Sequence, residues 1–343
     1  MNMKMKRLGR TGLMVTENSF GALPIQRLPR DEAVSLVRNA YEAGINYFDT
    51  ARAYSDSEEK LGLALSDVRQ NVIISTKSMG KTRDAVLRDL DVSLQNLKTD
   101  YVDILQLHNI PALPDPEDPE GLYTALVQAR QAGKCRFIGI TAHRLDVALA
   151  AARSGLYDTV QFPISYLSSD EDLQLIDVCR EHDVGLIAMK ALAGGLVSSG
   201  TAAFAFFAGL PNAVPIWGIQ RESELRKFLD AADKQITLTP ELQSIIDRDK
   251  QELTGNFCRG CGYCKPCPVG IDMPTVGRMS LLLRRSPWQT YATPEWREKM
   301  SLAEKCIGCG ACQSRCPYGI DGSQLARANW EDYKVFMHEK GIF

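Results

Sequence analysis

The sequence predicts an α/β protein in which a (β/α)8 barrel of the TIM type is followed by a smaller, mostly helical domain. Two observations favour the barrel. Short apolar runs alternate with amphipathic stretches up to about residue 235, and no G-x-G-x-x-G follows an early run, which disfavours a doubly wound dinucleotide-binding sheet. A third observation predicts the second domain: eight of the ten cysteines lie between Cys258 and Cys316.

The predicted strands are apolar on both faces, as expected of parallel strands that helices cover on each side. They are "NSFGAL", "GINYFD", "NVIIST", "YVDILQLH", "CRFIGIT", "DTVQFP", "VGLIAM" and "AVPIWG", with helical patterns such as "DEAVSLVRNAYEAG" between them. Eight such units fit a closed barrel. The opening "MKRLGRTGLMV" predicts a hairpin over the barrel bottom, because a Gly-centred turn separates two extended runs.

We place the barrel at residues 1–238, a connecting helix at 239–256 and the cysteine-rich domain at 257–343. The connecting helix has Thr239 before Pro240 at its start and Gly255 past its end. The last domain contains an internal repeat. A C-x2-C-x2-C series is followed by "CPVGID", and a second C-x2-C-x2-C series is followed by "CPYGID". The segments "MPTVGRMSLLLRR" and "TPEWREKMSLAEK" carry helix-start signals, so we expect a mostly helical fold there.

The charge pattern narrows the classes of partner. The 343 residues carry a formal net charge of -2 without a dense Lys/Arg run, which disfavours nucleic acid and an anionic membrane surface. The N-terminus has no apolar leader, and no later stretch approaches the length of a spanning helix. We therefore expect no nucleic-acid partner, no membrane partner and a cytoplasmic location. Cys135 and Cys179 lie in apolar surroundings and are predicted core residues.

The clustered cysteines predict bound metal, because thiols stay reduced in the cytosol. A C-x2-C-x2-C series followed by C-P is the pattern of a 4Fe-4S site, and the last Cys commonly ligates the other cluster. Two clusters are predicted, one on Cys258, Cys261, Cys264 and Cys316, the other on Cys306, Cys309, Cys312 and Cys267. Two residues precede Cys267 where the second series has three, so its role stays open. A pair of structural zinc sites is the alternative.

Four titratable side chains lie at or just after the ends of successive predicted strands, where barrel enzymes have their active sites. Asp49 ends the second strand and Tyr54 follows it, while Lys77 and His108 end the third and fourth. Each residue alone has an ordinary structural explanation, such as a capping carboxylate or a core histidine. Their joint placement predicts a catalytic site.

The stretches "GINYFDTARAYSDSEEKLGLAL", "VIISTK", "YVDILQLH" and "LGRTGLMV" resemble the aldo-keto reductase family over nearly all of the barrel. The tail is similar to that of the branch with a C-terminal, alpha-helical ferredoxin-type domain. The resemblance implies that Asp49, Tyr54, Lys77 and His108 are catalytic. Tyr54 would be the general acid or base, helped by the Lys77 ammonium, in NAD(P)H-dependent carbonyl reduction or alcohol oxidation.

The resemblance also implies NADP(H) or NAD(H) at the ends of the later strands. Thr141 and Gln161 match carboxamide-binding positions, and the pyrophosphate would lie on Lys190, Gly194 and Gly195. The adenosine half is assigned to Gly218, Gln220, Arg221 and Glu224. Ala142, Met189 and Leu225 depart from the family pattern, so the choice between NAD and NADP stays open. His143 is a further candidate beside the fifth strand.

These observations predict an oxidoreductase that acts on a small carbonyl or alcohol and whose clusters exchange electrons with a partner protein. Because nicotinamide moves two electrons as hydride and a cluster moves one, structural and redox-sensing roles for the clusters stay open. The alternative is a non-catalytic barrel scaffold that carries an iron-sulfur electron-transfer or interaction module. The four residues at the strand ends favour the enzyme.

Overall fold

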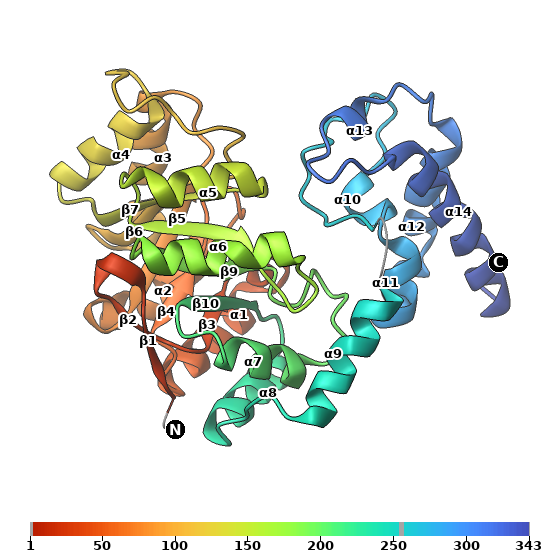
Figure 1. Ribbon diagram of the computed structural model, residues 1–343, viewed down its shortest axis with the longest axis horizontal. Coiled ribbons are helices and arrows are strands. Elements are labelled where there is room, and N and C mark those ends of the chain that lie inside the picture. The colour runs from red at the N-terminus through yellow and green to blue at the C-terminus, as the bar shows by residue number, and fades with distance from the viewer. Residues whose placement is uncertain (1–2, 254–256, 343) are drawn as a thin grey trace. The chain divides into compact units, whose positions relative to one another are not determined.

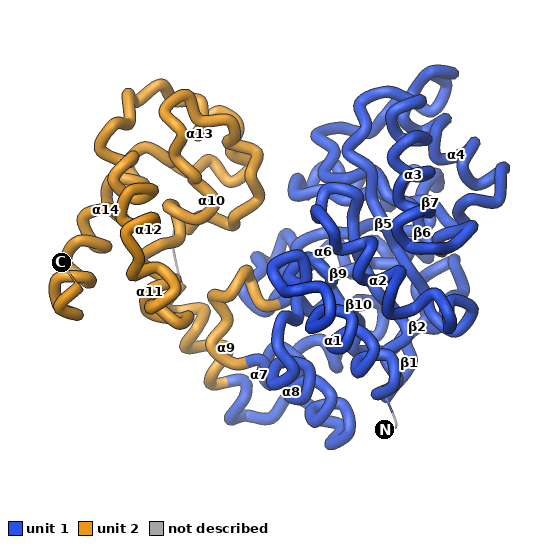
Figure 2. The backbone as a smooth tube through the Cα atoms, turned by 180° about the vertical axis from the view of Figure 1, so that it is seen from behind, with its two compact units in different colours: residues 1–191, 200–243 blue, residues 192–199, 244–343 orange. Residues whose placement is uncertain are grey.

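The structure, a computed structural model, describes residues 3–253 and 257–342. It contains two compact units, which Figure 2 distinguishes by colour. Unit 1 comprises Met1–Ala191 and Gly200–Gln243, and unit 2 comprises Leu192–Ser199 and Ser244–Phe343. The domain limits at residues 238 and 256 stay predictions.

Unit 1 is a closed barrel of eight parallel strands in the order β10-β3-β4-β5-β6-β7-β8-β9 (Figure 1), which confirms the predicted fold class. The strands are β3 (Ser19–Gly21), β4 (Tyr47–Asp49), β5 (Ile73–Ser78), β6 (Val102–Leu107), β7 (Cys135–Thr141), β8 (Thr159–Pro163), β9 (Gly185–Met189) and β10 (Ala213–Gly218). The helices around them are α1 (Arg30–Glu42), α2 (Ser57–Leu65), α3 (Arg83–Leu97), α4 (Leu122–Gln131), α5 (Leu145–Ser154), α6 (Asp170–Glu181), α7 (Gly200–Ala208) and α8 (Glu222–Asp233). Because all eight strands are parallel, their carboxyl ends meet at one rim.

The other end of the barrel is closed by the predicted hairpin. Its strands β1 (Met5–Arg7) and β2 (Met14–Thr16) pair antiparallel. Leu8 and Leu13 join an apolar cluster with Ile73, Ile187 and Val214 from the barrel strands. This plug excludes water from the barrel interior at the end opposite to the strand-end residues.

Unit 2 is helical, as predicted. Its helices are α9 (Pro240–Glu252), α10 (Met273–Val276), α11 (Met279–Arg285), α12 (Pro294–Ser301), α13 (Ala311–Ser314) and α14 (Gly322–Glu339). Residues 254–256, at the end of the predicted connecting helix and including Gly255, lie outside the described residues. Among the described residues, no helix combines the length and the apolar character needed to cross a bilayer.

Gly277 divides the segment "MPTVGRMSLLLRR" into α10 and α11. A Cβ added to Gly277 would lie only 3.0 Å from the Cβ of Cys258, so only glycine allows the backbone to approach this cysteine so closely. The core of the unit is built from apolar side chains of these helices, among them Met279, Met300, Trp330 and Tyr333. The cysteine loops therefore rest on a small packed core.

Asp103, near the start of β6, is a buried anion on which the barrel wall depends. It accepts hydrogen bonds from Arg69 at 2.8 Å, from Arg136 at 2.7 Å and from the backbone N–H of Ile74 at 2.9 Å. We expect Asp103→Asn to lower the free energy of unfolding by about 3 kcal/mol, because it leaves the buried Arg69 charge uncompensated. Urea unfolding followed by circular dichroism measures the change.

The matched control is Asp183→Asn, which breaks the exposed ion pair between Asp183 and Arg7. Solvent screens that pair, so the unfolding midpoint should not move measurably. Equal midpoint shifts for the two variants would contradict the structural importance of Asp103.

Candidate active site and cysteine clusters

The carboxylate and ammonium predicted from the strand ends form a buried ion pair. Lys77 Nζ donates to Asp49 Oδ1 at 2.5 Å and to the Thr50 carbonyl at 2.6 Å. The side chains of Lys77 and Asp49 are only 1% and 2% exposed. The strands β4 and β5 are neighbours, so parallel pairing brings the two residues together from different parts of the chain. The pair is thus held inside the barrel mouth.

Ser75 completes the environment of Asp49. Its Oγ donates to Asp49 Oδ2 at 2.5 Å, and its Oγ also shares a hydrogen bond with the Tyr47 hydroxyl at 2.9 Å. The sequence interpretation missed Ser75. The signal was available, because Ser75 and Lys77 are two positions apart in one strand and so point to the same face.

Tyr54 lies beside this ion pair. Lys77 Nζ lies 5.3 Å from the centre of the Tyr54 ring, and the His108 ring meets the Tyr54 ring edge-on at 5.7 Å between centroids. Burial raises the pKa of Tyr54; the Lys77 ammonium opposes this rise and the Asp49 carboxylate adds to it. The phenol therefore keeps its proton at neutral pH.

His108 follows β6 and is neutral at neutral pH. Burial, with help from the ammonium groups of Lys77 and Lys81, lowers the pKa of His108 to about 3. Its buried Nδ1 has no hydrogen-bond partner among the described residues. A neutral imidazole presents one N–H donor, so this residue is suited to hold an uncharged oxygen. The structure thus brings all four predicted catalytic residues to one rim.

The two residues predicted to hold the carboxamide already have partners. The hydroxyl oxygen of Thr141 accepts from the backbone N–H of Asn109 at 2.7 Å. The Gln161 carbonyl oxygen accepts from the Gln106 amide at 2.9 Å, and the Gln161 amide nitrogen lies 3.5 Å from Asp49 Oδ1. Gln161 therefore connects to the Lys77–Asp49 ion pair.

Asn109 and His143 form a polar pair that the sequence interpretation did not connect. His143 Nδ1 and Asn109 Oδ1 are 2.7 Å apart, and Asn109 has a φ of 56°. Burial, then the nearby Lys190 ammonium and His108, lower the pKa of His143 well below its usual value. The effect of Lys190 shows that this predicted pyrophosphate ligand lies close to the strand-end histidines.

The residues assigned to the adenosine half form the start of α8. The Glu224 carboxylate accepts the backbone N–H groups of Gln220 and Arg221 at 2.9 and 3.1 Å, and it binds the Arg221 guanidinium. Gly218 ends β10 and is exposed, whereas Leu225 is fully buried. Leu225 is therefore a core residue, and Arg221 is the exposed cation at this helix start.

The remaining predicted pyrophosphate ligands, Gly194 and Gly195, lie in unit 2. Both have positive φ, 67° and 94°. They belong to the loop Leu192–Ser199 between β9 and α7, which we call the β9–α7 loop.

The eight motif cysteines all lie in unit 2. Burial, and then the charges of Cys261 and Cys316 among others, raise the pKa of Cys258, so these three thiols are neighbours. A mostly apolar hollow is lined by cysteines from both series: Cys264, Cys267, Cys306, Cys309 and Cys312. Cys267 lies beside Cys306, Cys309 and Cys312 in this hollow, but Cys264 of the first series lines it too, so the division of the ligands between two clusters stays a prediction.

The surroundings of the thiols fit iron-sulfur clusters. A Cβ on Gly322 would lie 2.8 Å from Cys312 Sγ, just as a Cβ on Gly277 would crowd Cys258. In each cysteine series, a glycine therefore leaves room beside one of the cysteines. Within the described residues, no three His, Cys, Asp or Glu side chains are close enough to hold a single metal ion.

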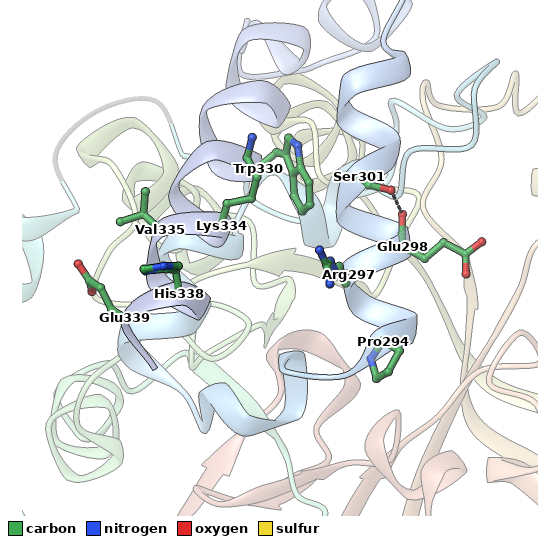
Figure 3. A pocket seen from close by; sticks show the side chains of 9 residues that line it. All are labelled: Pro294, Arg297, Glu298, Ser301, Trp330, Lys334, Val335, His338 and Glu339. Atoms are coloured by element: carbon green, nitrogen blue, oxygen red, sulfur yellow. Dashed lines mark hydrogen bonds between the residues drawn. The ribbon is translucent and has the colours of Figure 1, made fainter. Parts of the chain in front are cut away.

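A separate open groove of about 1020 Å³ lies between α12 and α14 (Figure 3). The charged residues that line it are Arg297 and Lys334, which are basic, and Glu298 and Glu339, which are acidic. Because these charges have both signs, the groove has no electrostatic potential of a single sign that would attract a charged partner. Its lining also lacks the ligand set of a metal site. We assign it no part in the site.

Comparisons with known proteins identify both parts of the chain. The sequence profile of the Aldo/keto reductase family matches residues 16–203, and that of a 4Fe-4S dicluster domain matches residues 257–321. L-galactose dehydrogenase of Arabidopsis thaliana is 34% identical over 214 residues, which are 57% of this chain and 67% of the relative. The chain spans about two thirds of the length of such curated relatives.

Solved structures show the same barrel. The holo form of aldo-keto reductase AKR11C1 from Bacillus halodurans aligns with a TM-score of 0.60 and 23% identity, over 72% of this chain and 96% of that one. An aldo-keto reductase of Bombyx mori in complex with NADP aligns with a TM-score of 0.56 and 20% identity, over 73% and 93% of the two chains. At these identities the likeness concerns the fold.

The lowered pKa of His108 predicts a pH-dependent loss of stability. The folded pKa of about 3 is below the unfolded value of about 6.5, so only the unfolded state takes up a proton as the pH falls through 6.5. Between about pH 7.5 and 5.5 this one group should lower the free energy of unfolding by about 1 kcal/mol. His108→Gln should lack this contribution, as measured by urea unfolding at both pH values. A variant whose pH dependence parallels that of the wild type would contradict the burial of a neutral His108.

Proposed function

The chain belongs to the aldo/keto reductase family and carries a 4Fe-4S dicluster domain, and from this premise we propose how its barrel works as an oxidoreductase. In this proposal the barrel reduces a small carbonyl compound with NADPH or NADH, or oxidises the corresponding alcohol. The observation that carries the proposal is the buried Lys77–Asp49 ion pair beside a protonated Tyr54.

Tyr54 is the proposed general acid. When bound, the nicotinamide supplies or accepts a hydride at the substrate carbon. The Tyr54 hydroxyl gives its proton to the substrate oxygen as negative charge develops there, and the reverse transfer accompanies alcohol oxidation. The Lys77 ammonium lies 5.3 Å from the ring and favours the tyrosinate that remains. Asp49 holds Lys77 in place, since a buried ammonium needs an anionic partner.

His108 is the proposed positioning group for the substrate oxygen. Being neutral, it donates a hydrogen bond without adding a second positive charge beside Lys77. The Asn109–His143 pair follows neighbouring strand ends and offers further polar groups toward the substrate or the carboxamide.

Nucleotide contacts are proposed for the later strand ends. Thr141 and Gln161 would face the carboxamide. Lys190 and the backbone of Gly194 and Gly195 would receive the pyrophosphate, because an ammonium and N–H groups of left-handed residues bind anions. The adenosine half would lie on the α8 start, at Gly218, Gln220, Arg221 and Glu224. Arg221 is paired with Glu224, so its charge does not by itself decide between NADPH and NADH. Titration of the protein with each nucleotide measures which of them binds.

We further propose two 4Fe-4S clusters on the eight motif cysteines. They would exchange single electrons with a partner protein. Cys309 is the one exposed cysteine of the eight, and Ile307 beside it is 68% exposed. An apolar residue next to an exposed ligand suits transient docking, so this loop is the proposed contact for an electron carrier.

Tyr54→Phe tests the acid. We expect kcat/KM for reduction of 4-nitrobenzaldehyde to fall about 100-fold to 10,000-fold, because the proton donor is lost, while the Kd for the nicotinamide nucleotide stays the same. Tyr157→Phe is the matched control, since it removes a buried hydroxyl that has no hydrogen-bond partner among the described residues. Full activity of Tyr54→Phe would refute the proposed mechanism.

Paired cysteine variants test the cluster ligands. Anaerobically purified wild type should contain about eight iron and eight sulfide per chain. Cys267→Ala and Cys316→Ala should each lose about half of both, in spectroscopically different halves, because each removes a ligand of a different cluster. Cys179→Ala, a buried core cysteine, should keep all of the iron. Zinc without a brown chromophore would overturn the assignment.

A further inference from the structure

The β9–α7 loop begins just after Lys190 and Ala191 in the barrel, yet it packs as part of the iron-sulfur unit. Leu192–Ser199 belongs to unit 2, whereas β9 before it and α7 after it belong to unit 1 (Figure 2). The chain therefore passes from a barrel strand into the iron-sulfur unit and back to a barrel helix.

Three hydrogen bonds fix this loop within unit 2. Arg278 Nη1 donates to the Gly194 carbonyl at 3.2 Å, and Arg285 Nη1 donates to the Leu196 carbonyl at 2.8 Å. The backbone N–H of Ser198 donates to Asp249 Oδ2 at 2.9 Å. Arg285 and Asp249 also form an ion pair at 3.1 Å with side chains 9% and 1% exposed. The network thus holds the loop at the backbone of Gly194, Leu196 and Ser198.

Arg278 connects the loop with the first cysteine series. A Cβ on Gly260 would lie 3.0 Å from Arg278 Cζ, and a Cβ on Gly194 would lie 2.3 Å from Arg278 Nη1. The guanidinium therefore fits between two glycines, one in each loop. The backbone N–H of Gly260 in turn points to Cys258 Sγ at 3.3 Å. Arg278 Nε donates to the Pro274 carbonyl at 2.7 Å, which fixes the direction of the side chain.

We propose that Arg278 is a positioning residue that couples the occupancy of the first cluster to nucleotide binding on the β9–α7 loop. The inference rests on the proposed pyrophosphate role of Gly194 and Gly195. A cluster bound by Cys258 fixes the backbone of Gly260, this backbone confines Arg278, and Arg278 holds the carbonyl of Gly194. The N–H groups of the loop are then preorganised for an anion, and binding no longer has to order them.

Linkage makes the coupling reciprocal. If the cluster strengthens nucleotide binding by some factor, the bound nucleotide strengthens retention of the cluster by the same factor. This second effect can be measured without any enzymatic turnover. It also separates Arg278 from a residue that merely stabilises the fold, because a purely structural residue would not make cluster retention depend on the nucleotide.

The test compares cluster-loaded wild type with Arg278→Gln. We expect Arg278→Gln to keep its iron and sulfide but to bind NADP⁺ or NAD⁺, whichever binds the wild type, roughly fivefold more weakly or worse. The second measurement is the rate at which an iron chelator bleaches the brown absorbance. The nucleotide should slow bleaching of the wild type and have no effect on Arg278→Gln. If Arg278→Gln loses iron, Arg278→Lys replaces it in the same nucleotide measurements. Lysine keeps the positive charge but lacks the forked donors of the guanidinium.

Arg284→Ala is the matched control. Arg284 lies in α11, the helix that Arg278 precedes, and its guanidinium binds the Ser280 carbonyl and, at 2.6 Å, Asp332, so both measurements should match the wild type. Unchanged nucleotide affinity and intact nucleotide protection in iron-loaded Arg278→Gln would overturn the inference and leave the proposed function standing. If neither NADP⁺ nor NAD⁺ binds iron-loaded wild type, the proposed function itself fails.

Discussion

The proposed chemistry of the barrel depends on one buried ion pair, Lys77 with Asp49. Two charges that are almost completely removed from water are tolerated only if every strong donor and acceptor around them is used. Here Ser75 and Gln161 surround the carboxylate, and the Thr50 carbonyl accepts from the ammonium. These partners fix the ammonium in one position. The phenol of Tyr54 can therefore meet a stationary positive charge, which a flexible surface lysine would not provide.

The barrel topology explains why the sequence could group residues of the proposed site. Asp49, Lys77 and His108 are positioned by parallel strands, and the ends of neighbouring parallel strands must meet at one rim. Locating the strands was therefore enough to group these residues. Tyr54 lies on the loop after β4, so the end of that strand predicted its region, and its role as the acid followed from the family resemblance. The direction of its pKa was not visible in the sequence, because the net shift depends on burial competing with the Lys77 charge.

Contacts between side chains were harder to predict than strand ends. Glu224 and Arg221 bind each other at the start of α8, and Gln161 connects Gln106 with Asp49. Each of these side chains could bind either a ligand or a neighbouring side chain, and the sequence alone does not decide between the two. The duplicated cysteine series, by contrast, reveals its metal chemistry from spacing alone. The role of Cys267 stays a prediction, because its local spacing is irregular and the hollow that it lines contains cysteines of both series.

The two kinds of cofactor carry different numbers of electrons, and the β9–α7 loop in unit 2 offers another way to couple them. A nicotinamide carries a pair of electrons and a cluster carries one, so direct exchange between them needs an intermediate carrier. Coupling through the backbone does not require equal numbers of electrons, because the cluster changes the free energy of nucleotide binding and transfers no electron. In that case the iron-sulfur unit influences the barrel by ordering the Gly194 backbone, even if no electron passes between them. The fusion of the two domains then has a physical consequence that depends on Arg278 and not on a redox path.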